Sequence, residues 1–234
     1  MPPEPVLVAW SGGKDCALAL RATVADPETR VAALLTTVTE EYGRISMHGV
    51  RRSLLLAQAA SLGLPLVEVG IPADCPNELY EARMRSALDG QVRERGIRGV
   101  VFGDLFLEDV RAYRERQLAG TGVRGVFPLW GRATRELARE LIDDGFRATV
   151  CVVDPRRVHP AFAGRAYDRP LLSDLPADVD PCGENGEFHT FVHDGPIFAR
   201  PVSFELGVLV ERDGFWFRDL VPNGSHDERA AADA

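Results

Sequence analysis

The chain has 234 residues, 45% of them hydrophobic, so it is long enough to bury a full core without disulfides or a structural metal. Its formal net charge of −8 argues against broad electrostatic capture of nucleic acid, which needs a cationic face. No basic leader or membrane-length apolar run is visible and the four cysteines form no C-x-x-C pair, so we expect a cytoplasmic protein with no membrane partner and no zinc site.

The first half of the chain alternates short β-branched runs with longer helical stretches, which is the pattern of right-handed βαβ units. Strands are predicted near Val6–Trp10, Val31–Val38, Leu64–Val69 and Gly99–Phe102. Helices are predicted near Cys16–Val24, Gly49–Leu62 and Asn77–Arg95, with another beginning near Glu108. This half therefore predicts an α/β fold with a doubly wound parallel sheet.

The second half changes character after Pro128. A helix (Thr134–Asp143), a strand (Ala148–Val153) and a Pro- and Asp-rich stretch (residues 168–181) are predicted in turn. Three antiparallel strands follow, at Phe188–Val192, Val202–Glu211 and Phe215–Asp219, with the Asp-Gly signal of a hairpin between the last two. We predict a domain over residues 1–130, a smaller α+β domain over residues 131–222, and a disordered tail over residues 223–234.

The loop at residues 11–16, Ser-Gly-Gly-Lys-Asp-Cys, joins the first predicted strand to the first predicted helix. A helix N-terminus presents free N–H groups, Gly12 and Gly13 permit close approach of backbone to phosphate oxygens, and Lys14 adds a positive charge. Ser11 adds a hydroxyl, and Asp15 could cap the helix or hold a metal ion. A plain tight turn is the alternative. The loop nevertheless follows the first strand of a parallel sheet, where ligands collect, and it matches neither a Walker A nor a G-x-G-x-x-G pattern.

Two positions elsewhere in the first half are candidate ligand contacts. Gly103-Asp104 follows the strand that should lie beside the first strand, so Asp104 is either a magnesium or ribose contact or an ordinary turn aspartate. His48 precedes the second helix and is either a nucleotide or substrate contact or a surface histidine.

The second half contains an acidic motif at residues 180–191, Asp-Pro-Cys-Gly-Glu-Asn-Gly-Glu-Phe-His-Thr-Phe. Alone it is an acidic, Gly-rich loop that leads into a strand. Its glycines would allow a backbone path that aims both Glu184 and Glu187 into one cleft. Such a pair could coordinate a divalent cation, or bind ammonium and remove its proton.

The loop at residues 11–16 resembles the pyrophosphate-binding loop of the PP-loop ATP pyrophosphatases, although Cys16 stands where that loop usually ends in Ser. The acidic motif is similar to the Glu-x-Gly-Glu-[Tyr/Phe]-x-Thr signature of the diphthine-ammonia ligase family within that group. The matching residues are Glu184, Gly186, Glu187, Phe188 and Thr190. The resemblance covers about residues 5–220.

This resemblance implies a Rossmann-like PP-loop domain that binds ATP over residues 1–130 and a substrate- and ammonia-handling domain over residues 131–222. The implied reaction joins ammonia to a carboxylate, on a small molecule or a modified protein side chain, with ATP and Mg²⁺ and release of AMP and pyrophosphate. It gives catalytic roles to Lys14, Glu184 and Glu187. It gives ATP contacts to Ser11, Gly12, Gly13, Lys14, Asp15, Cys16, Gly103 and Asp104, with Mg²⁺ at Asp15 and Asp104. It gives substrate contacts to His48, Asn185, Gly186, His189 and Thr190, and it leaves a homodimer open.

Two other functions stay open at this point. One alternative is a tRNA-modifying enzyme that transfers sulfur, which Cys182 in the acidic motif would favour. The acidic net charge and the lack of a C-x-x-C pair argue against it. A non-catalytic sensor of adenine nucleotides could use the same sheet.

Overall fold

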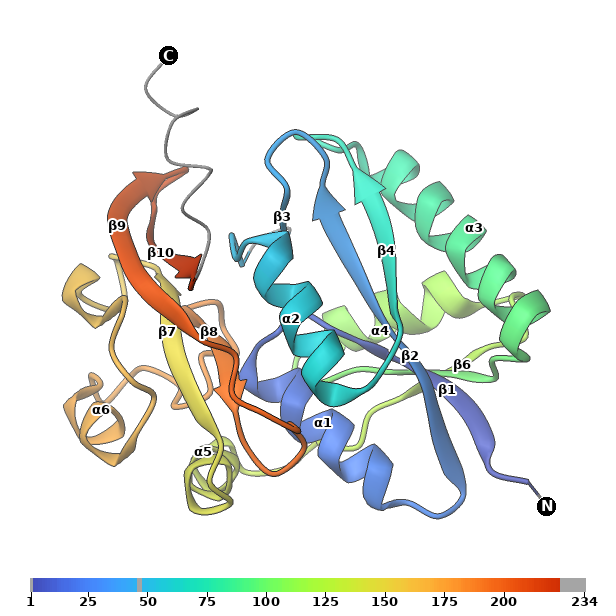
Figure 1. Ribbon diagram of the computed structural model, residues 1–234, viewed down its shortest axis with the longest axis horizontal. Coiled ribbons are helices and arrows are strands. Elements are labelled where there is room, and N and C mark those ends of the chain that lie inside the picture. The colour runs from blue at the N-terminus through green and yellow to red at the C-terminus, as the bar shows by residue number, and fades with distance from the viewer. Residues whose placement is uncertain (1, 46–47, 224–234) are drawn as a thin grey trace.

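The computed structural model describes residues 2–45 and 48–223 and arranges them around two β-sheets (Figure 1). The six-stranded sheet is built by the first half of the chain and is mostly parallel. The four-stranded sheet is built by the second half and is antiparallel. The predicted fold class, a doubly wound parallel sheet with a smaller α+β region after it, is confirmed.

The parallel sheet has its first strand in the interior. Its strands are β1 (Glu4–Ala9), β2 (Thr29–Thr39), β3 (Arg44–Ile45), β4 (Leu66–Ile71), β5 (Gly99–Val101) and β6 (Arg124–Val126). β1 pairs in parallel with both β2 and β5. Leu34 and Leu35 of β2 pair with β1 on one edge and with β4 on the other, which gives the parallel order β4-β2-β1-β5-β6. The order reverses between β1 and β5, where α/β sheets bind ligands.

Helices cover both faces of this sheet. They are α1 (Lys14–Ala25), α2 (Arg52–Leu62), α3 (Asn77–Arg95) and α4 (Glu108–Leu118). Val6 and Val8 of β1 belong to the buried cluster that contains α1 and α2, whereas Leu7 belongs to the cluster that contains α3 and α4. The alternation along β1 follows from the two-residue repeat of a strand, and it shows that both faces are buried.

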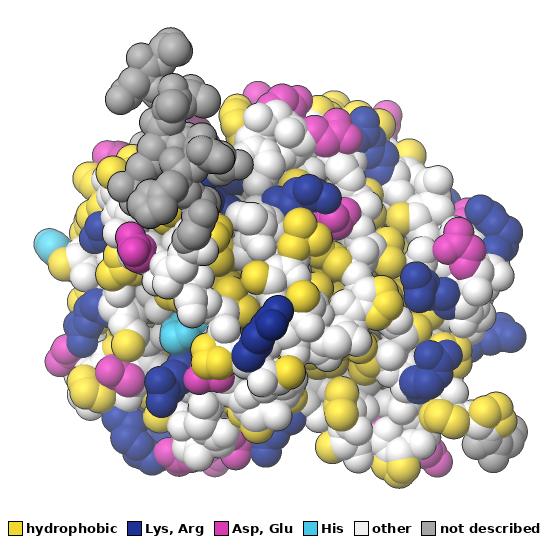
Figure 2. Space-filling model, in the orientation of Figure 1, with side chains coloured by type: hydrophobic (Ala, Val, Ile, Leu, Met, Phe, Trp, Pro, Cys, Tyr) yellow, Lys and Arg dark blue, Asp and Glu magenta, His cyan; other side chains and the backbone are white. Residues whose placement is uncertain are grey.

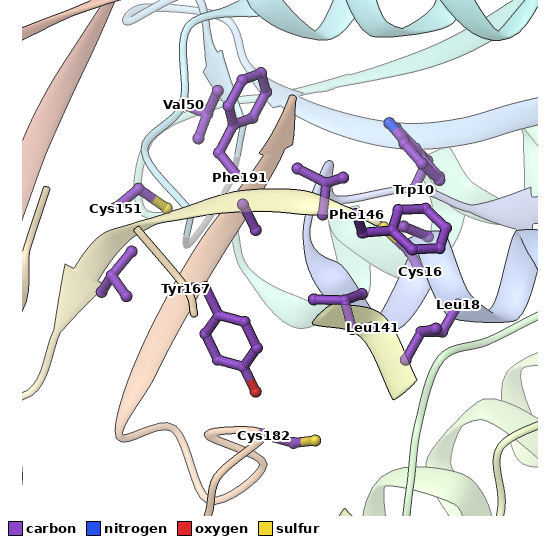
Figure 3. Packing of buried hydrophobic residues seen from close by; sticks show 14 of the residues in the cluster. Trp10, Cys16, Leu18, Val50, Leu141, Phe146, Cys151, Tyr167, Cys182 and Phe191 are labelled. Carbon is purple, nitrogen blue, oxygen red and sulfur yellow. The ribbon is translucent and has the colours of Figure 1, made fainter. Parts of the chain in front are cut away.

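The antiparallel sheet packs on the side of the first sheet that carries α1 and α2 (Figure 1). Its strands are β7 (Arg147–Val153), β8 (Phe188–Asp194), β9 (Phe204–Arg212) and β10 (Phe215–Pro222), in the order β8-β7-β10-β9. The helices of this half are α5 (Thr134–Asp143) and α6 (Arg169–Asp174), with a 3-10 turn, η1 (Pro160–Phe162). Leu141 and Phe146 lie against Trp10 and Leu18 (Figure 3), so one core runs through both halves of the chain.

Several elements differ from the sequence expectations for local reasons. α2 begins at Arg52 and not near Gly49, because Gly49 has a φ of 63°, outside the helical region. β3 and β6 are too short to give a periodic signal, and α6 lies inside the Pro- and Asp-rich stretch. The Asp213-Gly214 hairpin is confirmed, with φ angles of 51° and 80°. The tail predicted from residue 223 falls, from residue 224 on, outside the described residues.

Charged side chains of both signs are dispersed over the face shown in Figure 2, with apolar side chains between them. On that face the described Lys and Arg side chains do not gather into one continuous field, in keeping with the acidic net charge of −8. Within residues 2–45 and 48–223, no helix has the length and apolarity to cross a bilayer.

Candidate active site

A cavity of about 710 Å³ lies at the carboxyl ends of β1, β2 and β5. Its walls come from the loop at residues 11–16, from α3 and α4, and from residues 183–190 of the second half. Among the candidate residues named from the sequence, Lys14, Asp104, His48, Glu184 and His189 all line it. The two sequence motifs, about 170 residues apart in the chain, therefore meet at one site.

The glycines of the 11–16 loop are fixed by backbone angle and by space. Gly12 has a φ of 81°, and a Cβ added to it would lie 2.7 Å from Oε1 of Gln58. Gly13 is the N-cap of α1, and a Cβ there would lie 3.1 Å from the carbonyl oxygen of Thr190. A side chain at either position would displace the packing that shapes the loop.

The second half of the chain braces this loop directly. The Gly12 carbonyl accepts a hydrogen bond from the backbone N–H of Val192 at 2.8 Å. The backbone N–H of Lys14 donates to Oγ1 of Thr190 at 3.1 Å. Thr190, which the family resemblance names as a substrate contact, thus caps the first turn of α1 from β8 while it also lines the cavity.

Gln58 of α2 does not line the cavity but supports the 11–16 loop, and sequence reasoning missed it. Its side chain is fully buried, accepts a hydrogen bond from Nε1 of Trp10 at 3.0 Å, and donates to the Gly12 carbonyl at 3.1 Å. It also donates to the carbonyl oxygen of Val192. A glutamine within a predicted helix gives no sequence signal for this role, because its partners are distant in the chain.

Lys14 is buried, with 3% of its surface exposed, and its Nζ lies 2.8 Å from Oδ2 of Asp15. Burial alone lowers the pKa of Lys14, but the carboxylate of Asp15 and other nearby acidic groups outweigh it and raise that pKa above its ordinary value. The ammonium also lies 5.5 Å from the ring centre of Phe188. Lys14 is therefore a permanent cation at the floor of the cavity.

Asp15 lies in the first turn of α1 and Asp104 just after β5, and each has a carboxylate oxygen without a hydrogen-bond partner among the described residues. A Cβ on Gly103 would lie 2.7 Å from the backbone carbon of Asp15, so the end of β5 packs directly on the first turn of α1. Oδ1 of Asp15 and Oδ2 of Asp104 are buried without a hydrogen-bond partner in the described chain. Burial raises the pKa of both carboxyls, against the opposing effects of Lys14 on Asp15 and of Arg114 on Asp104. Unsatisfied carboxylate oxygens suit a hard cation such as Mg²⁺.

The two glutamates of the acidic motif have separate environments. Glu184 lines the cavity, accepts a hydrogen bond from the backbone N–H of Leu105 at 2.8 Å, and has its pKa raised to about 7, first by burial. Glu187 is 1% exposed and does not line the cavity. Its carboxylate accepts hydrogen bonds from the backbone N–H of Asp180 at 3.1 Å and from both nitrogens of Asn185 at 3.0 Å.

The expectation that both carboxylates point into one cleft is therefore wrong for Glu187. Its side chain turns into its own loop, because three N–H donors of that loop converge on it. Asn185 and Gly186 do border the cavity, although the Asn185 amide is bonded to Glu187. Of the two glutamates in this motif, only Glu184 lines the cavity.

His48 and His189 form a pair of imidazoles on the cavity wall, with ring centres 4.3 Å apart. Burial, followed by nearby positive charge, lowers the pKa of His48 well below its ordinary value and lowers the pKa of His189 to about 4. Both rings are neutral at neutral pH. Nδ1 of His48 is buried without a hydrogen-bond partner among the described residues, so it can meet a polar group of a ligand.

Cys16 keeps a neutral thiol in the loop at residues 11–16. Its Sγ donates to the carbonyl oxygen of Gly13 at 3.0 Å and lies 3.7 Å from Oγ of Ser11. Burial raises the pKa of this thiol to about 11. The thiol therefore supports the turn of the loop in place of the hydroxyl usual at this position.

Comparison with known families gives two matches. The family model of the diphthamide synthase N-terminal domain matches residues 5–125, and that of the diphthamide synthase C-terminal domain matches residues 133–222. A comparison with curated proteins gave no match.

Proposed function

The chain belongs to the diphthamide synthase family, and we propose that it is a ligase that uses ATP to turn a substrate carboxylate into an amide. Family membership supports an ATP-dependent, ligase-like activity. The finer proposal depends on one observation: the buried cation of Lys14 at the start of α1 shares a cavity with Glu184, which carries a raised pKa. A buried cation and a carboxyl group with a raised pKa thus share one cavity, which suits an anion site beside a proton acceptor.

The first step we propose is attack of a substrate carboxylate oxygen on the α phosphorus of ATP. The bond between the α phosphorus and the bridging oxygen breaks, pyrophosphate leaves, and an acyl-adenylate remains. Lys14 and the N-terminal N–H groups of α1 would stabilise the negative charge on the leaving pyrophosphate, because fixed donors in an enclosed site need no rearrangement. Ser11, Gly12 and Gly13 would shape the loop around that anion.

Mg²⁺ fits this site through Asp15 and Asp104, each of which has a buried oxygen without a hydrogen-bond partner among the described residues. The described residues contain no cluster of three or more side chains suited to hold a metal on their own. Mg²⁺ at nucleotide sites commonly uses one or two carboxylates and takes its other ligands from phosphates and water. When bound, the ion would supply positive charge to the phosphate oxygens.

The second step we propose is attack of ammonia on the acyl carbon, with AMP as the leaving group. The attacking nitrogen must lose a proton, and Glu184 with a pKa of about 7 is suited to accept it near neutral pH. The neutral rings of His48 and His189 would contact the substrate or ammonia. Glu187 and Thr190 would act indirectly. Glu187 would hold the acidic loop in place, and Thr190 would hold the phosphate loop.

The cysteines give little support to a sulfur-transferring function. Burial is the first cause that raises the pKa of the Cys16, Cys151 and Cys182 thiols, to about 11 for Cys16 and about 12 for Cys151. A sulfur carrier needs an accessible thiolate. A non-catalytic nucleotide sensor needs only to bind its ligand, so it would not require both Lys14 and Glu184 in the cavity.

The test is to incubate the protein with ATP, Mg²⁺, ammonium and a panel of carboxylates, and to identify the products. We expect AMP and pyrophosphate, formed only with the right carboxylate, and a loss of about 10²–10³-fold in rate for Lys14→Ala. Arg124→Ala is the control, because Arg124 pairs with Glu4 on the surface at 2.9 Å. ADP and phosphate as products, or normal turnover by Lys14→Ala, would exclude this mechanism.

A further inference from the structure

We propose that Arg114 of α4 is a second pyrophosphate-binding cation, held beside the phosphate loop by a loose contact with Asp104 that the anion replaces. This inference rests on the proposed function, since it assumes cleavage of ATP between its α and β phosphates. It adds a residue from a different helix to the anion site formed by Lys14 and the first turn of α1.

The contact between Arg114 and Asp104 is incomplete. Nε of Arg114 lies 3.6 Å from Oδ2 of Asp104, beyond the 2.7–3.2 Å typical of an N–H···O hydrogen bond. Both atoms are buried, and neither has a hydrogen-bond partner within the part of the chain that the structure describes. A buried guanidinium donor without a partner is costly, so a ligand oxygen that accepts from it would gain binding energy.

Aromatic packing holds the Arg114 guanidinium in the cavity wall. Its central carbon lies 5.0 Å from the ring centre of Phe102, the residue that follows β5. Phe102 is itself stacked on Phe127, with ring centres 5.4 Å apart. A cation over an aromatic face is held without losing its hydrogen-bond donors, so Arg114 remains able to bind an anion.

Arg114 and Asp104 lie beside the phosphate loop. Gly103, which directly precedes Asp104, packs so closely on α1 that an added Cβ would lie 2.9 Å from the backbone nitrogen of Cys16. Within residues 2–45 and 48–223, six charged side chains line the cavity, three cationic (Lys14, Arg85, Arg114) and three acidic (Asp15, Asp104, Glu184). Arg85 is exposed and donates to the carbonyl oxygen of Gln117. Arg114 is thus the second cation next to the loop, and a pyrophosphate group carries more charge than Lys14 can balance.

Arg111 supplies a matched control on the same helix. Its guanidinium also lies over aromatic rings, 4.7 Å from the centres of both Phe127 and Trp130. It does not line the cavity, and its Nε donates to Glu115 at 2.9 Å. Removing Arg111 therefore removes an arginine and a cation–π contact from α4 without touching the proposed anion site.

The experiment measures the binding of inorganic pyrophosphate with Mg²⁺, and separately of AMP, by titration calorimetry on the full chain. We expect Arg114→Gln to raise the Kd for pyrophosphate at least about tenfold, and to change the Kd for AMP less than twofold. Arg114→Lys should recover part of the loss because it restores the charge but not the fork of donors. Arg111→Gln should match the wild-type protein for both ligands.

The outcomes separate this inference from the proposed function. The role of Arg114 is wrong if the wild-type protein and Arg114→Gln bind pyrophosphate equally well. It is also wrong if Arg114→Gln loses affinity for AMP and for pyrophosphate to the same extent. An equal loss in Arg111→Gln would also overturn it, because the effect would then belong to the packing of α4. If wild-type protein binds neither ATP nor pyrophosphate, the proposed function itself fails. Thermal melts of each variant exclude a folding defect, and Arg114→Lys serves if Arg114→Gln does not fold.

Discussion

Replacing Glu187 with Gln should destabilise the fold and only secondarily affect the chemistry. The substitution leaves the size of the side chain unchanged but converts one carboxylate oxygen into an NH₂ group. At least one of the three converging N–H donors then faces another donor in a site that is 1% exposed. Losing a charge-assisted hydrogen bond and leaving a buried donor unsatisfied costs about 2–3 kcal/mol.

A loss of this size is measurable by thermal unfolding. For a chain of this length, 1 kcal/mol shifts the melting temperature by about 2–4 °C, so we expect Glu187→Gln to melt about 4–12 °C lower than the wild-type protein. Glu184→Gln is the matched control from the same loop. It keeps an oxygen that can accept from the Leu105 N–H, and at neutral pH it should melt no lower than the wild-type protein while losing activity.

The reasoning would be refuted by the opposite pattern. A Glu187→Gln variant that melts with the wild-type protein but makes no amide would return Glu187 to the chemical step. Calorimetry at several scan rates, with far-UV circular dichroism on the same samples, distinguishes a stability change from irreversible aggregation.

The other predictions concern Glu184 and Gln58. Because Glu184 must be ionised to accept a proton, the rate of amide formation at constant free NH₃ should rise as the pH passes about 7 and then level off. The Glu184→Gln variant should lack that rise. If the variant keeps the rise, another group is the base. The folded protein holds the Glu184 proton to higher pH than the unfolded chain does, so the free energy of unfolding of wild type relative to Glu184→Gln should fall from pH 4.5 to about 7 and stay constant above. Gln58→Leu removes the bonds to Trp10 and Gly12, and should cost about 2–4 kcal/mol in chemical denaturation and weaken ATP binding. Unchanged ATP affinity in that variant would show that the loop keeps its shape without Gln58.

The arrangement of the parallel sheet and the place of the 11–16 loop between β1 and α1 could be predicted because both follow from local pattern. A β-branched run, two glycines and an apolar helix are adjacent in sequence, and the position of β5 beside β1 follows from the strand order expected of a doubly wound sheet. The directions of Glu184 and Glu187 could not be predicted in the same way. Both lie in one Gly-rich turn, and which carboxylate meets the cavity depends on the backbone path of residues 180–187.

Contacts between distant segments were also beyond the sequence. Gln58 touches a strand that begins 130 residues later, and nothing near it in the chain indicates that contact. The bond from Lys14 to Thr190 spans 176 residues, so the resemblance that assigned Thr190 to substrate could not show that it also caps α1. Arg114 was not among the site residues inferred from the sequence, because an arginine in a charged helix is usually a surface residue.

The bonds from β8 to the 11–16 loop have a consequence for how the protein is made. The first half of the chain leaves the ribosome before Thr190 and Val192 have been synthesised, so its loop at first lacks the partners of the Lys14 amide and the Gly12 carbonyl. The proposed ATP site is therefore completed only after β8 has docked. A product truncated before β8 would lack these bonds, and we expect it to bind ATP more weakly than the full chain does.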